Sequence, residues 1–306
     1  AGNYSNKNKS LEKGVGLIDS VLIVLAIKNN LKSYEAKIIE IPVDDNGINI
    51  LILEERLKEL EKKKIQVKFI YLVPNFSNPS GITLSLLRRK KILELAKKYR
   101  IIILEDNPYG MLRYEGKPLP TIKELDTKGD NQNVIYLSTL SKLLAPGFRI
   151  GWIVAPHPIL EKIMLGVQST ILCVSAFTQR VAYEYFSDPS WYENIDQFIS
   201  IYSRRRDIMI KTLEDTFPQS ASWSKPKGGF FIWLKLPEYL NTKEILADAV
   251  RNKVAYVPGS GFYADDRGLS EARLAFCTEN TERIEKGIKI LSRIVKEKIK
   301  LYKSFK

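Results

Sequence analysis

Polar residues with complementary chemistry follow three apolar segments that have the composition of strands. The segments are FIYLV, IIILE and VIYLS. The polar residues at or just beyond their ends are Asn78, Asp106, Tyr109, Thr139, Ser141 and Lys142. In an open α/β sheet, ligands bind beyond the carboxyl ends of the strands. If the three strands are parallel neighbours, these side chains converge on one crevice.

The residue types suit an aldehyde cofactor that carries a pyridine ring. A lysine such as Lys142 can form a Schiff base with an aldehyde. A carboxylate such as Asp106 can keep a pyridine nitrogen protonated, so that the ring accepts electrons. Tyr109 and Asn78 are suitable donors to a phenolate oxygen on that ring.

The surroundings of Lys142 also suit a phosphate group. Thr139 and Ser141 supply hydroxyls, and Arg149 follows in the same segment, STLSKLLAPGFRIGW. Hydroxyls and a guanidinium bind phosphate well. Taken singly, NPSG is an ordinary turn, Asp106 can be a helix N-cap, and an isolated lysine is usually a surface residue. The combination favours pyridoxal phosphate.

The elements that must position these residues predict an α/β fold. We expect strands at 36–43, 67–74, 101–106, 133–139 and 148–156, with helices at 49–64 and 85–100. Apolar runs without polar alternation indicate a mostly parallel sheet that is covered on both faces.

The later part of the chain has a different character. We expect helices at 158–186 and 190–217, then strands at 228–237, 254–259 and 271–278 mixed with helices. This pattern predicts a smaller α+β domain. The predicted division is a large cofactor-binding domain at 1–195, an interdomain helix at 196–217 and a small domain at 218–306.

The charge balance does not by itself indicate a nucleic-acid or membrane partner. The 306 residues include 48 Lys and Arg against 35 Asp and Glu, a net charge of +13. The basic residues are interleaved with acids along helical segments, which is typical of a solvated face. With a single histidine, zinc sites and Ser–His catalysis are disfavoured, and we expect no metal.

The cysteines and the first apolar segment indicate a cytoplasmic protein. Cys173 and Cys277 lie in apolar runs without metal-ligand spacing, so we expect buried free thiols in a reducing compartment. The segment 15–27 contains Asp19 and is too short to span a bilayer. It is expected to be a buried strand or helix.

At this level of detail the chain resembles the fold-type I, class I/II aminotransferases. The motifs NPSG, EDNPYG, STLSKLLAPGFRIGW, KGGFFIWLKLP, VPGSGFY and EARLAFC occur in the order and approximate spacing of that family. The sequence is most similar to the branch of 2-aminoadipate and multi-substrate aminotransferases, which also supplies the enzyme-like domain of MocR-type regulators. The resemblance begins near Tyr34 and continues to the C-terminus.

The resemblance implies a site, an activity and an assembly. The implied cofactor-binding residues are Asn78, Asp106, Tyr109, Thr139, Ser141, Lys142 and Arg149. Lys142 would be the catalytic residue, forming the Schiff base and moving the Cα proton. Arg273 matches the arginine that binds the substrate α-carboxylate, and Asn78 would also contact substrate. The implied reaction moves an amino group between an amino acid and a 2-oxo acid in a homodimer.

One departure from the family keeps alternatives open. Family members carry a longer N-terminal region with a Gly-Ser-rich turn that surrounds the phosphate and an aromatic residue that stacks on the ring. Residues 1–33 contain neither. The alternatives are another reaction on the same cofactor, such as a β-lyase, or a weakly active or inactive cofactor-binding protein, either a truncated enzyme or a regulator-type sensor domain.

The side-chain preference of the substrate is also open. Phe230, Phe231, Trp233 and Tyr263 are candidates for an apolar side-chain pocket, although strand aromatics are more often core residues.

Overall fold

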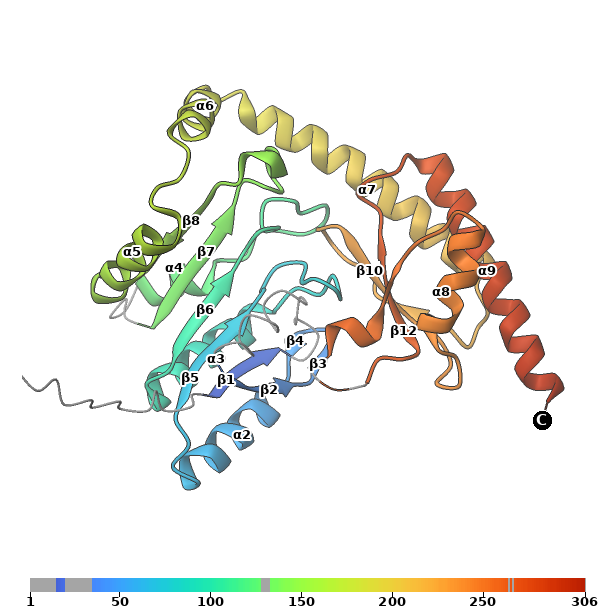
Figure 1. Cartoon of the computed structure of the whole chain (residues 1–306), viewed down its shortest axis with the longest axis horizontal. Coiled ribbons are helices and arrows are strands. Elements are labelled where there is room, and N and C mark those ends of the chain that lie inside the picture. The colour runs from blue at the N-terminus through green and yellow to red at the C-terminus, as the bar shows by residue number, and fades with distance from the viewer. Residues whose placement is uncertain (1–14, 20–34, 128–132, 264, 266, 306) are drawn as a thin grey trace, which may run out of the picture.

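The computed structural model describes residues 15–19, 35–127, 133–263, 265 and 267–305, and for 15–19 the backbone alone. The first part of the chain forms an α/β domain around a large sheet (Figure 1). Its elements are β1 (Val15–Asp19), β2 (Lys37–Ile41), β3 (Val43–Asp44), β4 (Gly47–Ile48), α2 (Ile50–Lys62), β5 (Val67–Leu72), α3 (Leu86–Tyr99), β6 (Ile102–Asp106), α4 (Ile122–Thr127), β7 (Val134–Thr139), the 3₁₀ turn η1 (Pro146–Phe148), β8 (Gly151–Val154), α5 (His157–Ile171) and α6 (Ala176–Ser187).

The large sheet is mostly parallel. Within the described residues its strand order is β2-β1-β5-β6-β7-β8. Every neighbouring pair is parallel except β7 with β8, which is antiparallel. The predicted α/β fold with a mostly parallel sheet is therefore confirmed, and β5, β6 and β7 are adjacent parallel strands.

The two faces of this sheet have different partners. On one face, Ile70, Leu72 and Ile103 belong to an apolar core completed mainly by α2 and α3. On the opposite face, Tyr71 belongs to a second cluster with Tyr109 and Phe231, which come from a loop and from the second domain. Successive residues of a strand point to opposite faces, so each strand contributes to both clusters.

β6 ends in two adjacent acidic residues that point to opposite faces. Glu105 is fully buried and accepts hydrogen bonds from the amides of Ile122 (2.9 Å) and Lys123 (2.8 Å), the first residues of α4. Burial raises the pKa of this carboxyl, and the two amide bonds oppose that shift. Asp106 faces the other side, where the second cluster lies.

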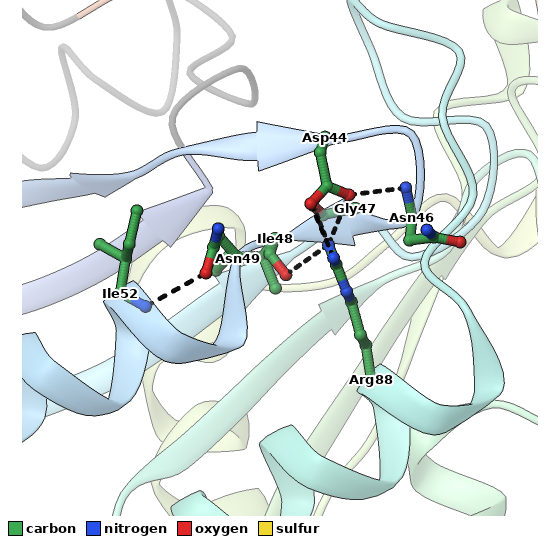
Figure 2. Close-up of polar contacts among 7 residues, drawn as sticks. All are labelled: Asp44, Asn46, Gly47, Ile48, Asn49, Ile52 and Arg88. Atoms are coloured by element: carbon green, nitrogen blue, oxygen red, sulfur yellow. Dashed lines mark hydrogen bonds and ion pairs between the residues drawn. The ribbon is translucent and has the colours of Figure 1, made fainter.

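The β3–β4 hairpin is attached to α3 by an arginine (Figure 2). Arg88 Nη2 donates to Asp44 Oδ2 at 2.7 Å, and Nη1 lies 2.7 Å from the carbonyl oxygen of Gly47. Gly47 has φ +97° and packs against Leu84, where a Cβ atom would clash. α2 follows, and its N-cap is Asn49, whose side chain accepts from the Ile52 amide at 3.2 Å.

The remaining elements form a second domain beside the sheet. They are α7 (Trp191–Thr216), β9 (Ser222–Trp223), β10 (Phe231–Lys235), α8 (Thr242–Arg251), β11 (Val257–Pro258), the 3₁₀ turn η2 (Gly259–Phe262), β12 (Glu271–Ala275) and α9 (Thr281–Ser304). The strands form an antiparallel sheet in the order β11-β12-β10-β9. The long helix α7 runs from the α6 end of the first domain to α9 (Figure 1). This arrangement agrees with the predicted α+β unit, while the predicted limits at 195 and 217 stay a prediction.

One expectation from the sequence was wrong in the region after β8. The stretch 158–186 is helical as expected, and it is divided into two helices because Leu172 has φ +60° and Ser175 caps a new helix at Ala176. Cys173 is exposed, since it lies in the connection between α5 and α6 and not in a core. Of the segment 15–27, residues 15–19 are a strand and the rest lies outside the described residues.

Candidate functional site

The loops that follow β5, β6 and β7 are tied together by buried hydrogen bonds. Asn75, after β5, donates from Nδ2 to Asn107 Oδ1 at 2.9 Å. Ser138, on β7, donates from Oγ to the Asn107 carbonyl at 3.0 Å. The fully buried Arg89 donates to Asn75 Oδ1 at 2.7 Å. Because buried polar groups with satisfied partners hold a fixed arrangement, these bonds fix the loops that carry the predicted site residues.

Asp106 lies at the carboxyl end of β6 and is held from the neighbouring strand. The Tyr71 hydroxyl donates to Asp106 Oδ2 at 2.6 Å. Burial raises the pKa of Asp106, and the bond from Tyr71 opposes the shift by stabilising the charged form. Tyr71 was not identified from the sequence. Its role depends on the order and register of two strands, which the motif FIYLV does not contain.

Tyr109 and Asn78 come from different loops and meet beside Asp106. Tyr109 is buried edge-on against Phe230 and Phe231, with ring centroids 5.6 and 6.1 Å away. Burial first, and the charge of Asp106 second, raise the pKa of Tyr109 well above its usual range. A hydrogen bond with the Asn78 side chain acts in the opposite direction. Tyr109 is therefore a neutral phenol that can donate a hydrogen bond.

Arg273 is a residue of the second domain that reaches the same group of side chains. It lies on β12, and its Nη1 donates to Asn78 Oδ1 at 2.7 Å. Its guanidinium carbon lies 4.2 Å from the ring centroid of Phe231 and 5.2 Å from that of Phe262. Burial lowers the pKa of Arg273. Its Nε is buried and has no hydrogen-bond partner among the described residues, which is uncommon for a buried donor.

Lys142 lies next to this group, in the turn that follows β7. Its side chain is partly buried. Cys277 lies near both Lys142 and Arg273: burial raises the pKa of its thiol, while the charges of Lys142, Arg273 and Arg205 oppose that shift. Cys277 is thus partly buried at the site, and the sequence predicted its burial but not its neighbours.

The predicted phosphate-binding residues lie in one turn but do not all contact one another. The Thr139 hydroxyl lies 2.9 Å from both Ser141 Oγ and the Ile150 carbonyl oxygen, and it accepts from the Ser141 amide at 3.1 Å. Arg149 is exposed, and its Nη1 donates to the Pro146 carbonyl at 3.3 Å. The structure therefore groups the two hydroxyls and leaves the guanidinium facing solvent.

The aromatic residues proposed for a substrate pocket divide into two groups. Phe230 and Phe231 pack with Tyr109, next to Arg273. Trp233 and Tyr263 form a separate buried cluster with Phe262. Phe231 and Phe262 are the rings that contact the Arg273 guanidinium, and Phe262 was not identified from the sequence.

The fold agrees with one class of protein, and so do the residues gathered at the strand ends. These are the lysine Lys142, the buried carboxylate Asp106 and the arginine Arg273 from the second domain. The chain belongs to the family described as aminotransferase class I and II, which it matches over residues 25–291. This confirms the family predicted from the motifs.

Within this family, the chain is similar to particular aminotransferases. It is 46% identical over 276 residues to aromatic-amino-acid aminotransferase 1 of Thermococcus litoralis, covering 90% of this chain and 66% of the relative. It thus spans about two thirds of that relative's length.

Solved structures give the same placement. A multiple substrate aminotransferase from Thermococcus profundus superimposes with a TM-score of 0.90 at 41% identity, covering 94% of this chain and 70% of that one. A kynurenine aminotransferase from Pyrococcus horikoshii, solved with PMP, kynurenine and its product, superimposes with a TM-score of 0.89 at 43% identity, covering 93% and 70%. The ligand PMP in the second structure agrees with the cofactor predicted for the family.

Two further findings concern only the described part of the chain. There, no group of three or more His, Cys, Asp and Glu side chains is arranged to hold a metal ion. In the same residues, no helix combines the length and apolar character needed to cross a membrane.

Proposed function

We propose that this chain is a pyridoxal-phosphate-dependent aminotransferase that moves an amino group between an amino acid and a 2-oxo acid. The observation that carries the proposal is the 2.7 Å contact between Arg273 and Asn78. It brings an arginine of the second domain to the strand ends that hold Asp106, Tyr109 and Lys142. A carboxylate-binding guanidinium and an amine are the two groups that an amino-acid substrate requires on opposite sides of its Cα atom.

The residues present fit pyridoxal phosphate. When bound, the cofactor supplies an electron-accepting ring and an aldehyde that an amine can attack. Lys142 would attach to the aldehyde and, once released, move a proton at the substrate Cα atom. Asp106 would meet the ring nitrogen as a carboxylate, while Tyr109 and Asn78 would donate to the ring oxygen. Thr139 and Ser141 would bind the phosphate, and Arg149 would have to turn inward from solvent to join them.

The substrate side of the site favours an α-carboxylate beside aromatic walls. Arg273 offers a buried Nε without a partner among the described residues, and its guanidinium lies over Phe231 and Phe262. An anion at this position would gain a charge-assisted hydrogen bond in a partly buried environment. The same rings can contact an apolar or aromatic side chain of the substrate. Amino acids with such side chains are therefore the preferred donors in this proposal.

The predicted homodimer and cytoplasmic location belong to the same proposal. Apolar side chains are exposed on α5 and α6, including Met164, Leu165, Phe177 and Tyr183. Exposed apolar side chains are common at interfaces between protein chains, and a second copy is the partner we propose. We propose no nucleic-acid or membrane partner.

The proposal is tested by titration of the purified apo-protein with pyridoxal phosphate, followed by a panel of amino donors. We expect an absorbance band of the bound aldehyde that disappears when an accepted donor is added. Aromatic donors should react fastest, and addition of a 2-oxo acid should restore the band. A protein that binds the cofactor but reacts with no donor would support the alternative of an inactive cofactor-binding protein.

Replacement of Arg273 by lysine should weaken substrate binding without changing cofactor binding. Lysine keeps the charge but loses the planar fork and the contacts with Phe231 and Phe262. We expect the apparent affinity for amino donors to fall by about tenfold or more, as for the loss of a charge-assisted hydrogen bond. Single-turnover kinetics and cofactor titration measure the two effects separately.

The matched control is Arg283→Lys, an exposed arginine of α9 that pairs with Glu279. It should leave both quantities unchanged. A loss of cofactor affinity in Arg273→Lys, with donor affinity intact, would instead assign Arg273 to the cofactor site or to the fold.

A further inference from the structure

We propose that Tyr71 is a positioning residue that holds the Asp106 carboxylate in place for the pyridine nitrogen. This role depends on the proposed function, because Asp106 has a ring nitrogen to meet only if pyridoxal phosphate binds. Tyr71 touches neither the cofactor nor the substrate in the proposal, and it acts through Asp106.

The register of the sheet determines this pairing. In the parallel pair β5–β6, Tyr71 lies opposite Leu104, so both side chains point to the same face. Asp106 lies two residues beyond Leu104 and therefore on that face as well. A residue at a diagonal position on the neighbouring strand is within reach of a long side chain. The Tyr71 hydroxyl accordingly reaches Asp106 Oδ2 at 2.6 Å.

The bond is protected from solvent and uses one of the two carboxylate oxygens. Tyr71 is only 4% exposed, so water does not compete freely for Oδ2. No bond to Oδ1 is found among the residues that the structure describes, which leaves Oδ1 for a protonated ring nitrogen. A carboxylate fixed through one oxygen presents the other in a constant direction, as a preorganised electrostatic partner requires.

The bond also favours the charged state that the proposed chemistry needs. Burial raises the pKa of Asp106, and the hydrogen bond from Tyr71 is the group that opposes it. Without the hydroxyl, the carboxyl would rotate more freely and its charged form would be less stable. An aromatic residue that served only to pack the second cluster would need no oxygen, so Tyr71→Phe separates packing from positioning.

The test compares pyridoxal phosphate with its 1-deaza analogue, in which a CH group replaces the ring nitrogen. Dissociation constants for both are measured by absorbance or fluorescence titration of the whole chain. The wild-type protein should prefer the cofactor with the nitrogen. Tyr71→Phe should reduce this preference by about tenfold, the size expected for a hydrogen bond to a charged group. Affinity for the deaza analogue should change little.

Tyr136→Phe is the matched control. Its hydroxyl accepts at 3.2 Å from Nδ2 of Asn107, the residue that follows β6, so the variant loses one side-chain hydrogen bond near the strand ends but none to Asp106. Its preference for the ring nitrogen should equal that of the wild-type protein. In an Asp106→Asn background, Tyr71→Phe should produce no further change.

Several outcomes would overturn the role of Tyr71. These are an unchanged preference in Tyr71→Phe, an equal loss of affinity for both ligands, or a further loss in the Asp106→Asn background. If Tyr71→Phe does not fold, ¹⁵N NMR of ring-labelled cofactor bound to the wild-type protein measures whether the ring nitrogen is protonated. An unprotonated nitrogen would contradict the role of Tyr71, because there would be no ion pair with Asp106 for it to position. Failure of the wild-type protein to bind either ligand would contradict the proposed function itself.

Discussion

Replacing Lys142 with alanine is expected to abolish transamination while leaving the fold intact. Its side chain is partly buried in the turn after β7, so the substitution removes little packing. What is lost is the amine that attaches to the cofactor and moves the proton at the substrate Cα atom. We expect activity to fall by at least about 10⁴-fold, the combined loss of attachment and general base catalysis. Steady-state assays measure it.

The attachment site can be located directly. Borohydride reduction of the wild-type protein with bound cofactor, followed by peptide mass mapping, should find the pyridoxyl group on Lys142. Lys117→Ala, at an exposed position in the loop before α4, is the control and should retain full activity. A pyridoxyl group on a different lysine would refute the assignment.

The second large effect is expected from Asp106→Asn, which keeps the shape of the side chain and removes its charge. An amide cannot form an ion pair with a protonated ring nitrogen, so the ring accepts electrons less readily. The rate should fall by about 100-fold or more, which corresponds to about 2.7 kcal/mol of transition-state stabilisation. Pre-steady-state measurement of the half-reaction isolates this step from product release.

Asp215→Asn provides a control for the same substitution at an exposed position of α7. It should react at the wild-type rate. Near-normal turnover in Asp106→Asn would remove Asp106 from the mechanism, and with it the reason to assign a positioning role to Tyr71.

Much of the α/β domain could be predicted from the sequence, because its signals are local. The predicted helices 49–64 and 85–100 correspond to α2 (Ile50–Lys62) and α3 (Leu86–Tyr99). The predicted strands 67–74, 101–106 and 133–139 correspond to β5, β6 and β7. Uninterrupted apolar runs and capping residues carry this information within a few positions of the chain.

Other features could not be predicted because they depend on tertiary packing. The stretch 158–186 was expected to be helical, but the break between α5 and α6 was not predicted, and α5 has no buried residue that would mark one face of it. The strand expected at 254–259 is only Val257–Pro258, since its length is set by pairing with β12. Tyr71 contacts Asp106 because of the strand register. Phe262 contacts Arg273 because of the packing within the second domain.

The hydrogen bonds of Glu105 also help to fix the register of β6, and with it the position of Asp106 at the site. A slip of β6 by one residue would exchange the faces of Glu105 and Asp106 and place the longer acid at the proposed ring nitrogen. That slip would also remove Glu105 from the two amides at the start of α4, leaving these donors without their partner. The alternative register is therefore penalised on the face remote from the chemistry. An insertion or deletion within β6 should consequently be far less tolerable than one in the loops on either side, even where every site residue is retained.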